Sequence, residues 1–278
     1  MASRSERQKR SASGKKSSPQ IVKTTYTSKE VAIPHDFLTT TRSDAEPTTV
    51  QRIDFKSSPI PEYDGCYATV LENVLSPSEC AQLLRLAEAS SPTGGWAPAL
   101  LNVGPGYEML AKDVRFHDRI IWDNEEIVKR IWDRCLKADG IADELSIHEE
   151  TWGRGSNAGS MKWRMTKVNE RMRFLRYGPG HYFKSHCDGA YETPDGSQRT
   201  FYTIQLYLND SLASGGDLKG GATSFHAPRN EERRINVNPR MGRVLIFQHA
   251  KLLHSGDEVT QGIKYTMRSD LLYEEVEE

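Results

Sequence analysis

The chain has 278 residues, with 37 lysines and arginines against 38 aspartates and glutamates, so its formal net charge is -1. This balance argues against a dedicated nucleic-acid-binding protein, which carries a clear basic excess. Hydrophobic residues make up 37% of the chain, and no stretch approaches the roughly 20 consecutive apolar residues of a membrane helix. We therefore expect a globular protein whose partners include neither a nucleic acid nor a membrane.

The first 58 residues differ in composition from the rest. Residues 1–24 are rich in Ser, Lys and Arg and offer almost nothing to bury, which is typical of a solvated tail. The basic cluster from Arg7 to Arg10 can alternatively be interpreted as a nuclear import signal. We predict a disordered or extended arm over 1–58 and a folded domain over 59–278.

The N-terminus and the cysteines bear on where the protein is located. The N-terminus lacks the apolar segment of a secretory signal. The four cysteines of the chain are widely spaced and form no CxxC pair, so we expect neither disulfides nor a structural zinc site. The expected location is the cytoplasm, with the nucleus as the alternative.

Two helices are predicted in the first half of the domain. Ser76 is placed as an N-cap, with Pro77 at the first helical position and Glu79 completing a capping box. A second helix is predicted to start at Asp123, with Glu126 completing its cap. Both helices carry one apolar face at helical spacing, so we interpret them as scaffold.

The pattern changes from about residue 170 onward. Short β-rich runs alternate with clusters of Gly, Pro, Asn and Asp, which predicts strands near 171–177, 181–186, 201–208, 223–226, 243–249 and 263–273. Many short strands after two helices indicate a mostly β protein of the α+β class. We expect an antiparallel sandwich or barrel with the helices packed on one sheet.

One cluster has the composition of a metal site. His186 and Asp188 are two residues apart, so on a strand they face the same side and can bind one ion together. His254 follows the apolar strand that ends near Phe247 and can supply a third ligand. Two histidines and one carboxylate form the facial triad that suits non-haem Fe(II), with positions left open for a co-substrate and dioxygen.

Two cations follow the third ligand. In a strand, Lys264, Thr266, Arg268 and Asp270 share one face, which can point toward the same space as the metal. A buried cation there requires an anion, and a dicarboxylate that chelates the metal at its other end would provide one. The alternatives are a solvated strand face or pairing of these cations with Asp270.

Six blocks of sequence carry a family resemblance, and their order and spacing make it more specific than the metal ligands alone. They are Arg176–Asp188, Thr203–Asn209, Gly220–Phe225, Pro239–Phe247, His254–Gly256 and Gly262–Lys264. Over about residues 170–273 the chain resembles the prolyl-4-hydroxylase-type branch of the 2-oxoglutarate- and Fe(II)-dependent dioxygenases. The resemblance implies a double-stranded β-helix, or jelly roll, and makes 59–278 a dioxygenase domain.

The resemblance also implies roles for single residues. The iron ligands fall on His186, Asp188 and His254. The basic residue that binds 2-oxoglutarate falls on Lys264, with Arg268 competing for that role or holding a substrate carboxylate. Tyr207 matches a tyrosine that reaches the distal carboxylate of the co-substrate, and Tyr177 matches one that lines its pocket. Gly220, Gly221 and Thr223 match a turn-and-strand element that we interpret as structural.

The implied activity is an oxidation that consumes 2-oxoglutarate and O2 at Fe(II), most commonly hydroxylation of an unactivated C–H bond. We expect a small-molecule substrate, such as an amino acid or secondary metabolite, because no peptide-binding module is visible. The alternatives are a prolyl hydroxylase acting on a protein and a non-catalytic jelly-roll binding protein. The oligomeric state stays open.

Overall fold

A computed structural model describes residues 21–39, 46–153 and 159–276. The predicted tail over 1–20, with its basic cluster, lies outside the described residues. Antiparallel strands are the predominant regular structure of the described chain, which confirms the predicted mostly β class and the jelly roll. None of the helices in the described part is both long and apolar enough to cross a membrane.

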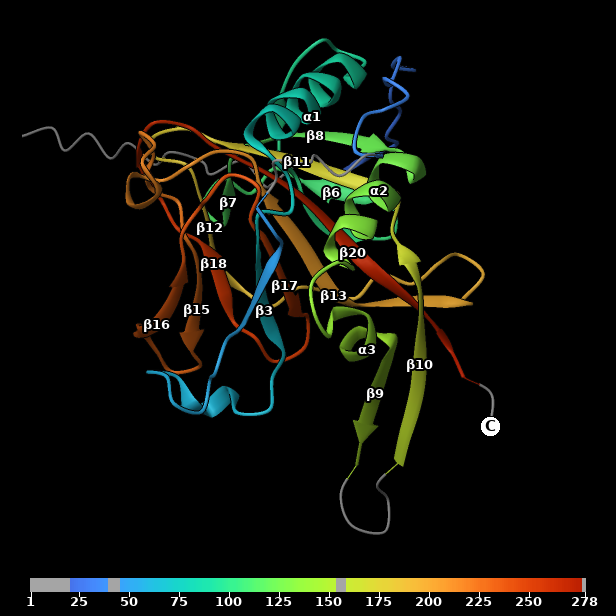
Figure 1. Cartoon of the computed structure of the whole chain (residues 1–278), viewed down its shortest axis with the longest axis vertical. Helices are drawn as coiled ribbons and strands as arrows, with labels where there is room; N and C mark the ends of the chain where they lie inside the picture. The colour runs from blue at the N-terminus through green and yellow to red at the C-terminus, as the bar shows by residue number, and fades with distance from the viewer. Residues whose placement is uncertain (1–20, 40–45, 154–158, 277–278) are drawn as a thin grey trace, which may run out of the picture.

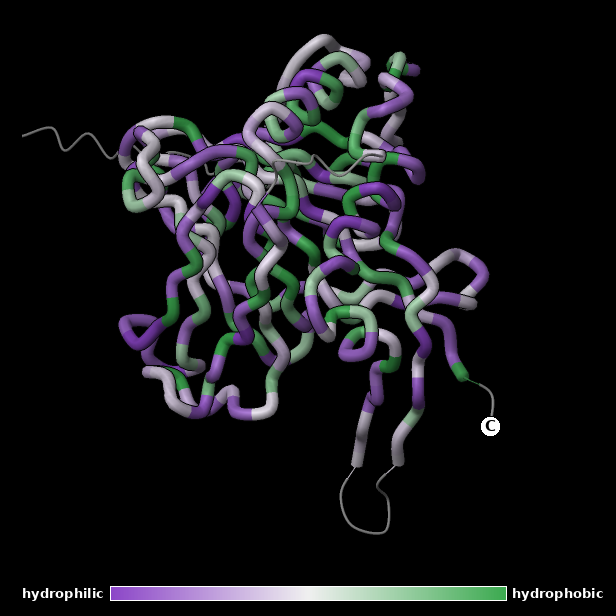
Figure 2. The backbone as a smooth tube through the Cα atoms, in the orientation of Figure 1, coloured by the Kyte–Doolittle hydropathy of each residue, from purple (hydrophilic) through white to green (hydrophobic). Residues whose placement is uncertain are grey.

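The larger sheet contains ten strands. Eight of them follow the order β2 (Thr49–Arg52), β3 (Ala68–Glu72), β17 (Val244–Gln248), β13 (Gln198–Tyr207), β20 (Lys264–Glu275), β11 (Arg171–Tyr177), β8 (Asp118–Asp123) and β4 (Ala97–Pro98). A hairpin of β9 (Ile147–Trp152) and β10 (Gly159–Val168) joins this sheet through the pairing of β10 with β20. Figure 1 shows the hairpin projecting from the body of the molecule, and Figure 2 shows that it is largely hydrophilic there.

A smaller sheet faces one side of the larger one (Figure 1). Its five strands follow the order β16 (Asn230–Val237), β15 (Thr223–Ala227), β18 (His254–Gly256), β12 (Tyr182–His186) and β7 (Arg115–Phe116). Two further small sheets are formed by β1 (Ile21–Lys23), β6 (Tyr107–Met109) and β5 (Leu101–Gly104), and by β14 (Lys219–Gly220) and β19 (Val259–Gln261).

Two large hydrophobic clusters hold these layers together, and β17 shows why they are separate. Successive side chains of a strand point to opposite faces. Val244 and Ile246 pack with the helices on one face of the larger sheet, whereas Leu245 and Phe247 pack between the two sheets. Because both faces are covered, the strand is apolar throughout.

The helices cover the outer face of the larger sheet. They are α1 (Pro77–Ser90), α2 (Glu125–Cys135) and the short α3 (Ile141–Ser146). Ser76 caps α1 and forms the predicted capping box with Glu79. The predicted start of α2 is wrong by one residue, because the side chain of Asn124 accepts the capping hydrogen bond from the Ile127 backbone. Asp123 instead pairs with Arg171 across two strands.

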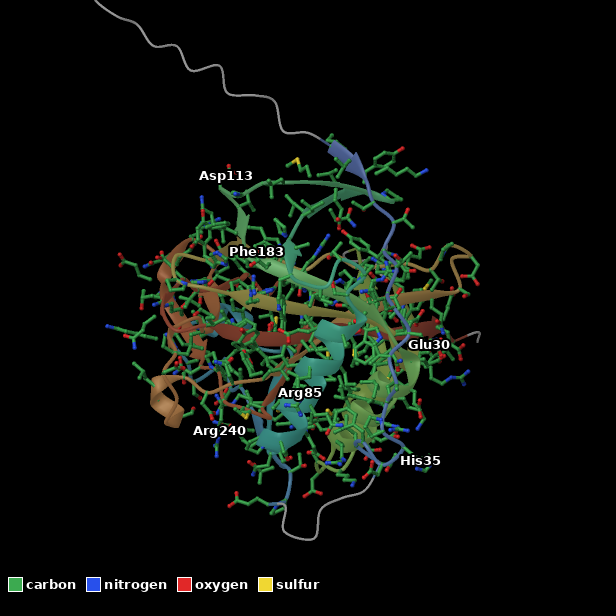
Figure 3. The ribbon with its side chains drawn as sticks, turned by 90° about the horizontal axis from the view of Figure 1, so that it is seen from above. Glu30, His35, Arg85, Asp113, Phe183 and Arg240 are labelled. Atoms are coloured by element: carbon green, nitrogen blue, oxygen red, sulfur yellow. The ribbon has the colours of Figure 1, made fainter. Side chains whose placement is uncertain are left out.

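The predicted arm contributes to the folded structure. Residues 49–52 form β2 and extend the larger sheet through their pairing with β3. Residues 21–23 form β1, which pairs with β6. Figure 3 shows the chain running from β1 past Glu30 to His35 along the side of the molecule. Folded structure therefore begins well before residue 59. These short segments have no core of their own and join the fold through strand hydrogen bonds.

Candidate active site

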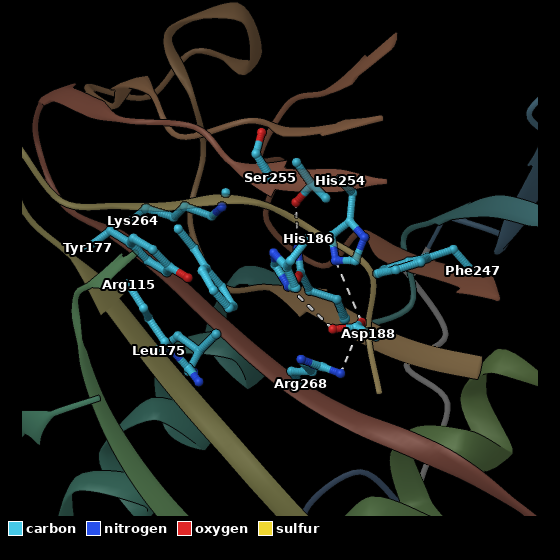
Figure 4. A pocket seen from close by; sticks show the side chains of 14 residues that line it. Arg115, Leu175, Tyr177, His186, Asp188, Phe247, His254, Ser255, Lys264 and Arg268 are labelled. Carbon is cyan, nitrogen blue, oxygen red and sulfur yellow. Dashed lines mark hydrogen bonds and ion pairs between the residues drawn. The ribbon is translucent and has the colours of Figure 1, made fainter. Parts of the chain in front are cut away.

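The three side chains predicted as metal ligands lie together between the two sheets. His186 ends β12, His254 begins β18, and these two residues lie opposite each other in the antiparallel pair. Asp188 follows in the loop after β12. The ligand atoms of all three residues lie within 4.8 Å of one another, and Figure 4 shows them converging in one pocket.

Backbone hydrogen bonds orient both imidazoles toward Asp188. His186 Nδ1 lies 2.8 Å from the Lys184 carbonyl oxygen, and His254 Nδ1 lies 3.0 Å from that of Leu252. Since a carbonyl only accepts, both Nδ1 atoms donate and both Nε2 atoms are left to bind an ion. The Nε2 atoms lie 3.4 Å and 3.6 Å from the Asp188 carboxylate oxygens.

The protonation states match those that metal ligands need. Burial would raise the pKa of Asp188, but Arg268, His254 and His186 hold it well below its usual range. Burial lowers the pKa of His254 to about 4 against the opposing attraction of Asp188. An ionised carboxylate and a neutral imidazole bind a metal without first losing a proton.

Two donors hold the Asp188 carboxylate at Oδ2, the oxygen that also faces His254. Oδ2 accepts hydrogen bonds from Thr203 Oγ1 at 2.6 Å and from Arg268 Nη2 at 2.9 Å. The same Nη2 atom lies 3.3 Å from Asp270 Oδ1. Arg268 is therefore committed to two carboxylates, one of the possibilities that the sequence left open. Arg173 pairs with the other oxygen of Asp270 at 2.9 Å.

Lys264 occupies a different part of the same pocket. Its side chain is buried, and its Nζ lies 5.0 Å from the ring centre of Tyr177 and 5.8 Å from that of Tyr207. Burial lowers the pKa of Lys264 to about 8, which the charge of Asp257 offsets only in part. Gly221, at a φ of +71°, leaves room for this side chain, because a Cβ there would lie 3.1 Å from Lys264 Cδ.

Thr223 lines the pocket near Lys264, and Tyr207 lies next to it, with its ring centre 5.8 Å from Lys264 Nζ. Thr223 Oγ1 accepts hydrogen bonds from the Tyr207 hydroxyl and from Gln205 Nε2, both at 2.8 Å. With both lone pairs of Oγ1 used, its hydroxyl proton is free to donate to a ligand. Thr223 lines the pocket, so our interpretation of it as purely structural was incomplete.

The family of the chain can be read from the segment that builds this pocket. Residues 172–269 match the family model of the 2OG-Fe(II) oxygenase superfamily. The chain is therefore similar to 2OG-Fe(II) oxygenases over residues 172–269, which contain all three predicted metal ligands. No curated protein sequence matches the chain.

Three solved structures with a similar arrangement are prolyl hydroxylases. One is a viral collagen prolyl hydroxylase from Paramecium Bursaria Chlorella virus-1, at 18% identity and a TM-score of 0.46, covering 76% of this chain and 97% of that one. The second, from Pseudomonas putida, has 12% identity, a TM-score of 0.48 and coverages of 78% and 94%. The third, from Trichoplax adhaerens, has 17% identity, a TM-score of 0.49 and coverages of 73% and 82%.

The donor set of this oxygenase fits the cofactors of its superfamily, which are Fe(II), 2-oxoglutarate and O2. Two imidazole nitrogens and one carboxylate suit non-haem Fe(II), and they leave coordination positions open. A buried lysine in the same pocket suits the carboxylate of a co-substrate.

Sequence reasoning missed the roles of three polar residues of the site. Thr203 was not singled out and Thr223 was interpreted as structural, and only the cross-strand contacts reveal what they bind. Arg115 lies on the two-residue strand β7 and lines the pocket. It follows a turn rather than a periodic run, so no pattern in the sequence marked it.

Proposed function

We propose that this oxygenase couples the oxidative decarboxylation of 2-oxoglutarate to the hydroxylation of an unactivated C–H bond in a small molecule. One observation carries the proposal: a single pocket between the sheets contains a metal-ligand triad and, apart from it, a buried lysine beside two tyrosine rings. A chelating dicarboxylate is the ligand that satisfies both groups at once.

Each residue has a separate part in this proposal. His186, Asp188 and His254 hold Fe(II), and Lys264 binds the distal carboxylate of 2-oxoglutarate. Dioxygen, activated at bound Fe(II) with 2-oxoglutarate as the co-substrate, would supply the oxidising power, which no side chain of the protein can provide. Tyr177 and Tyr207 keep water away from the Lys264 ammonium, and Thr223 offers a hydrogen bond to the same carboxylate.

We assign Lys264 rather than Arg268 to the co-substrate because of their present partners. Arg268 already donates to Asp188 and partly neutralises the charge of Asp270. Lys264 has only the more distant charge of Asp257 acting on it. A buried cation that lacks a carboxylate partner gains most from an anionic ligand.

A small substrate is favoured by the structure around the pocket. Arg115 and Arg119 both donate to the Leu100 carbonyl, at 3.4 Å and 3.3 Å, directly before the hairpin of β5 and β6. Tyr26 of the arm hydrogen-bonds to Glu108 on that hairpin. The Leu100 carbonyl and Tyr26 therefore tie the hairpin and the arm to the region around Arg115, which supports a closed pocket more than an open peptide groove.

The test measures succinate formation from 2-oxoglutarate under Fe(II) and air, with free amino acids and small organic acids in one panel and proline-containing peptides in another. We expect succinate to rise with a member of the first panel, whose product gains one oxygen atom by mass spectrometry. Stimulation by the peptides alone would favour the prolyl hydroxylase alternative, since one of the similar structures is in complex with a hypoxia inducible factor peptide. Failure to bind both Mn(II) and 2-oxoglutarate would favour the non-catalytic binding protein.

A further inference from the structure

We propose that the substrate of this oxygenase is held by a carboxylate group, and that Arg115 is the residue that binds it. The inference rests on the proposed function, because it treats the pocket as one that contains Fe(II) and 2-oxoglutarate. It narrows the substrate class to small carboxylic acids, free amino acids included.

Arg115 is a pocket cation without an acidic partner. Its Nε donates to His117 Nε2 at 2.8 Å, and its Nη1 donates to the Leu100 carbonyl at 3.4 Å. Among the described residues, no carboxylate oxygen lies within ion-pair distance of this guanidinium. The remaining donors of the guanidinium fork are available to a ligand.

His117 does not balance the charge of Arg115. Its Nδ1 lies 3.0 Å from the Asp118 carbonyl oxygen and therefore donates, so Nε2 accepts from Arg115 and the ring is neutral. Burial and the neighbouring Arg115 hold the pKa of His117 well below its usual range. The imidazole thus fixes the orientation of the guanidinium while leaving its full positive charge in the pocket.

The surrounding charges leave an excess that an anion must balance. Arg173 and Arg268 are cross-strand neighbours and share Asp270. A ferrous ion, Lys264, Asp188 and a doubly charged 2-oxoglutarate would cancel one another. Arg115, Arg173 and Arg268 then have one carboxylate among them, so two positive charges remain. The side chains of Arg173 and Arg268 are only 24% and 18% exposed, and a charge held away from water without a partner is costly. A carboxylate on the substrate would offset part of this charge, whereas a neutral prolyl residue would offset none.

The distance between Arg115 and the metal ligands suits a small substrate. The guanidinium carbon of Arg115 lies 4.8 Å from the ring centre of Phe183, and that ring centre lies 3.7 Å from the imidazole of His186. The guanidinium is therefore at most 8.5 Å from the centre of a metal-binding side chain. An acid with a few carbon atoms can span this gap between its carboxylate and a C–H bond near the metal.

The test uses the full chain with Mn(II) and saturating 2-oxoglutarate, so that Lys264 and the metal positions are already filled. Acetate, propionate and benzoate are titrated against their amides, and sodium chloride matches the ionic strength. The readout is the rise in Tm, converted to apparent Kd. Since hydrogen bonds to charged groups exceed neutral ones, we expect each acid to bind about tenfold or more tighter than its amide.

Three variants locate the effect. Arg115→Met should abolish the preference for acids, whereas Arg115→Lys should retain part of it. Arg176→Met is the matched control, because Arg176 pairs with Asp118 and does not line the pocket. It should keep the full preference.

The outcomes separate this inference from the proposed function. Equal binding of acids and amides to the unmodified protein overturns the inference even if Arg115→Met proves unstable, and so does an acid preference that survives Arg115→Met. In both cases Mn(II) and 2-oxoglutarate would still raise Tm. If they do not, the proposed function itself fails.

Discussion

Two regions of one pocket differ in how their charged side chains are paired. Around Asp188, opposite charges alternate across the strands, from Arg173 to Asp270, Arg268 and Asp188, at distances of 2.9 to 3.3 Å. Around Lys264, the ammonium nitrogen lies 5.0 Å and 5.8 Å from the ring centres of Tyr177 and Tyr207. In the first region the four side chains balance one another's charge before a metal binds, whereas the second region requires an anion from outside.

The difference separates positioning from ligand binding. A guanidinium that holds a carboxylate fixes the geometry of that carboxylate, as second partners of metal ligands commonly do. A buried ammonium without a carboxylate partner is costly to the folded protein, so its presence is best explained by a ligand. On this basis we propose that Arg268 positions the metal ligand Asp188, whereas Lys264 and Arg115 bind the molecules that enter the pocket.

The largest expected effect is the loss of metal binding in Asp188→Ala. The substitution removes the single negative charge among the three ligands and leaves Arg268 facing the metal position. We expect a loss in Mn(II) affinity greater than the roughly 10- to 100-fold typical when a second partner of a ligand is lost. Isothermal titration calorimetry measures it. Cys187→Ala is the control, because Cys187 is exposed, and near-normal affinity in Asp188→Ala would refute the triad.

The next largest effects distinguish the roles of the two cations, Lys264 and Arg268. Lys264→Met should weaken 2-oxoglutarate binding by about 10- to 100-fold, the range for a lost hydrogen bond to a charged group. Its Mn(II) affinity should stay close to normal. Arg268→Met should show the reverse, with weakened Mn(II) binding and little direct change for 2-oxoglutarate. Calorimetric titrations with each ligand separate the two, and a drop in 2-oxoglutarate affinity confined to Arg268→Met would reverse our assignment.

The ligand triad could be predicted because its signal is local. His186 and Asp188 are two residues apart at the end of a strand, and His254 begins the strand beside it. The polar face of β20 was also predictable, since alternation places Lys264, Arg268 and Asp270 on one side. Strand periodicity therefore anticipates which residues face the pocket.

The rest depends on contacts that no local pattern records. Thr203 reaches Asp188 and Arg268 only because β13 and β20 pair, although Thr203 and Arg268 are 65 residues apart. The early strands β2, β3 and β8 were missed because each is short and joins the larger sheet through distant partners. The β9–β10 hairpin was missed because its sequence is largely polar and it projects from the core.

A smaller effect tests the hydrogen bond from Thr203 to Asp188. Thr203→Val keeps the shape of the side chain and removes a donor 2.6 Å from Oδ2. We expect Mn(II) affinity to fall by about tenfold, the lower end for loss of a second partner. Thr200→Val is the matched control on the same strand, because Thr200 is buried and bonds to the Tyr191 backbone instead. Equal affinities in the two variants would remove Thr203 from the metal site.

The smallest expected effect is a pH dependence that arises at Lys264. Burial lowers its pKa to about 8, whereas an exposed lysine titrates near 10.4. Binding of 2-oxoglutarate requires the ammonium form, so affinity should be constant below pH 7 and fall about fivefold between pH 8 and 9 as that form is depleted. Titrations of the Mn(II)-loaded protein at each pH measure this, and Lys264→Arg should remove the decline because arginine stays charged.

The ligand-free protein should respond to pH in the opposite direction. Between pH 8 and about 10.4 the unfolded chain binds the Lys264 proton more tightly than the folded protein does. The contribution of Lys264 to the free energy of unfolding therefore rises with pH over this interval, while 2-oxoglutarate affinity declines. Comparing urea unfolding of the ligand-free protein with that of Lys264→Met isolates this contribution. A difference that does not change with pH would mean that Lys264 titrates normally and is already paired in the folded protein.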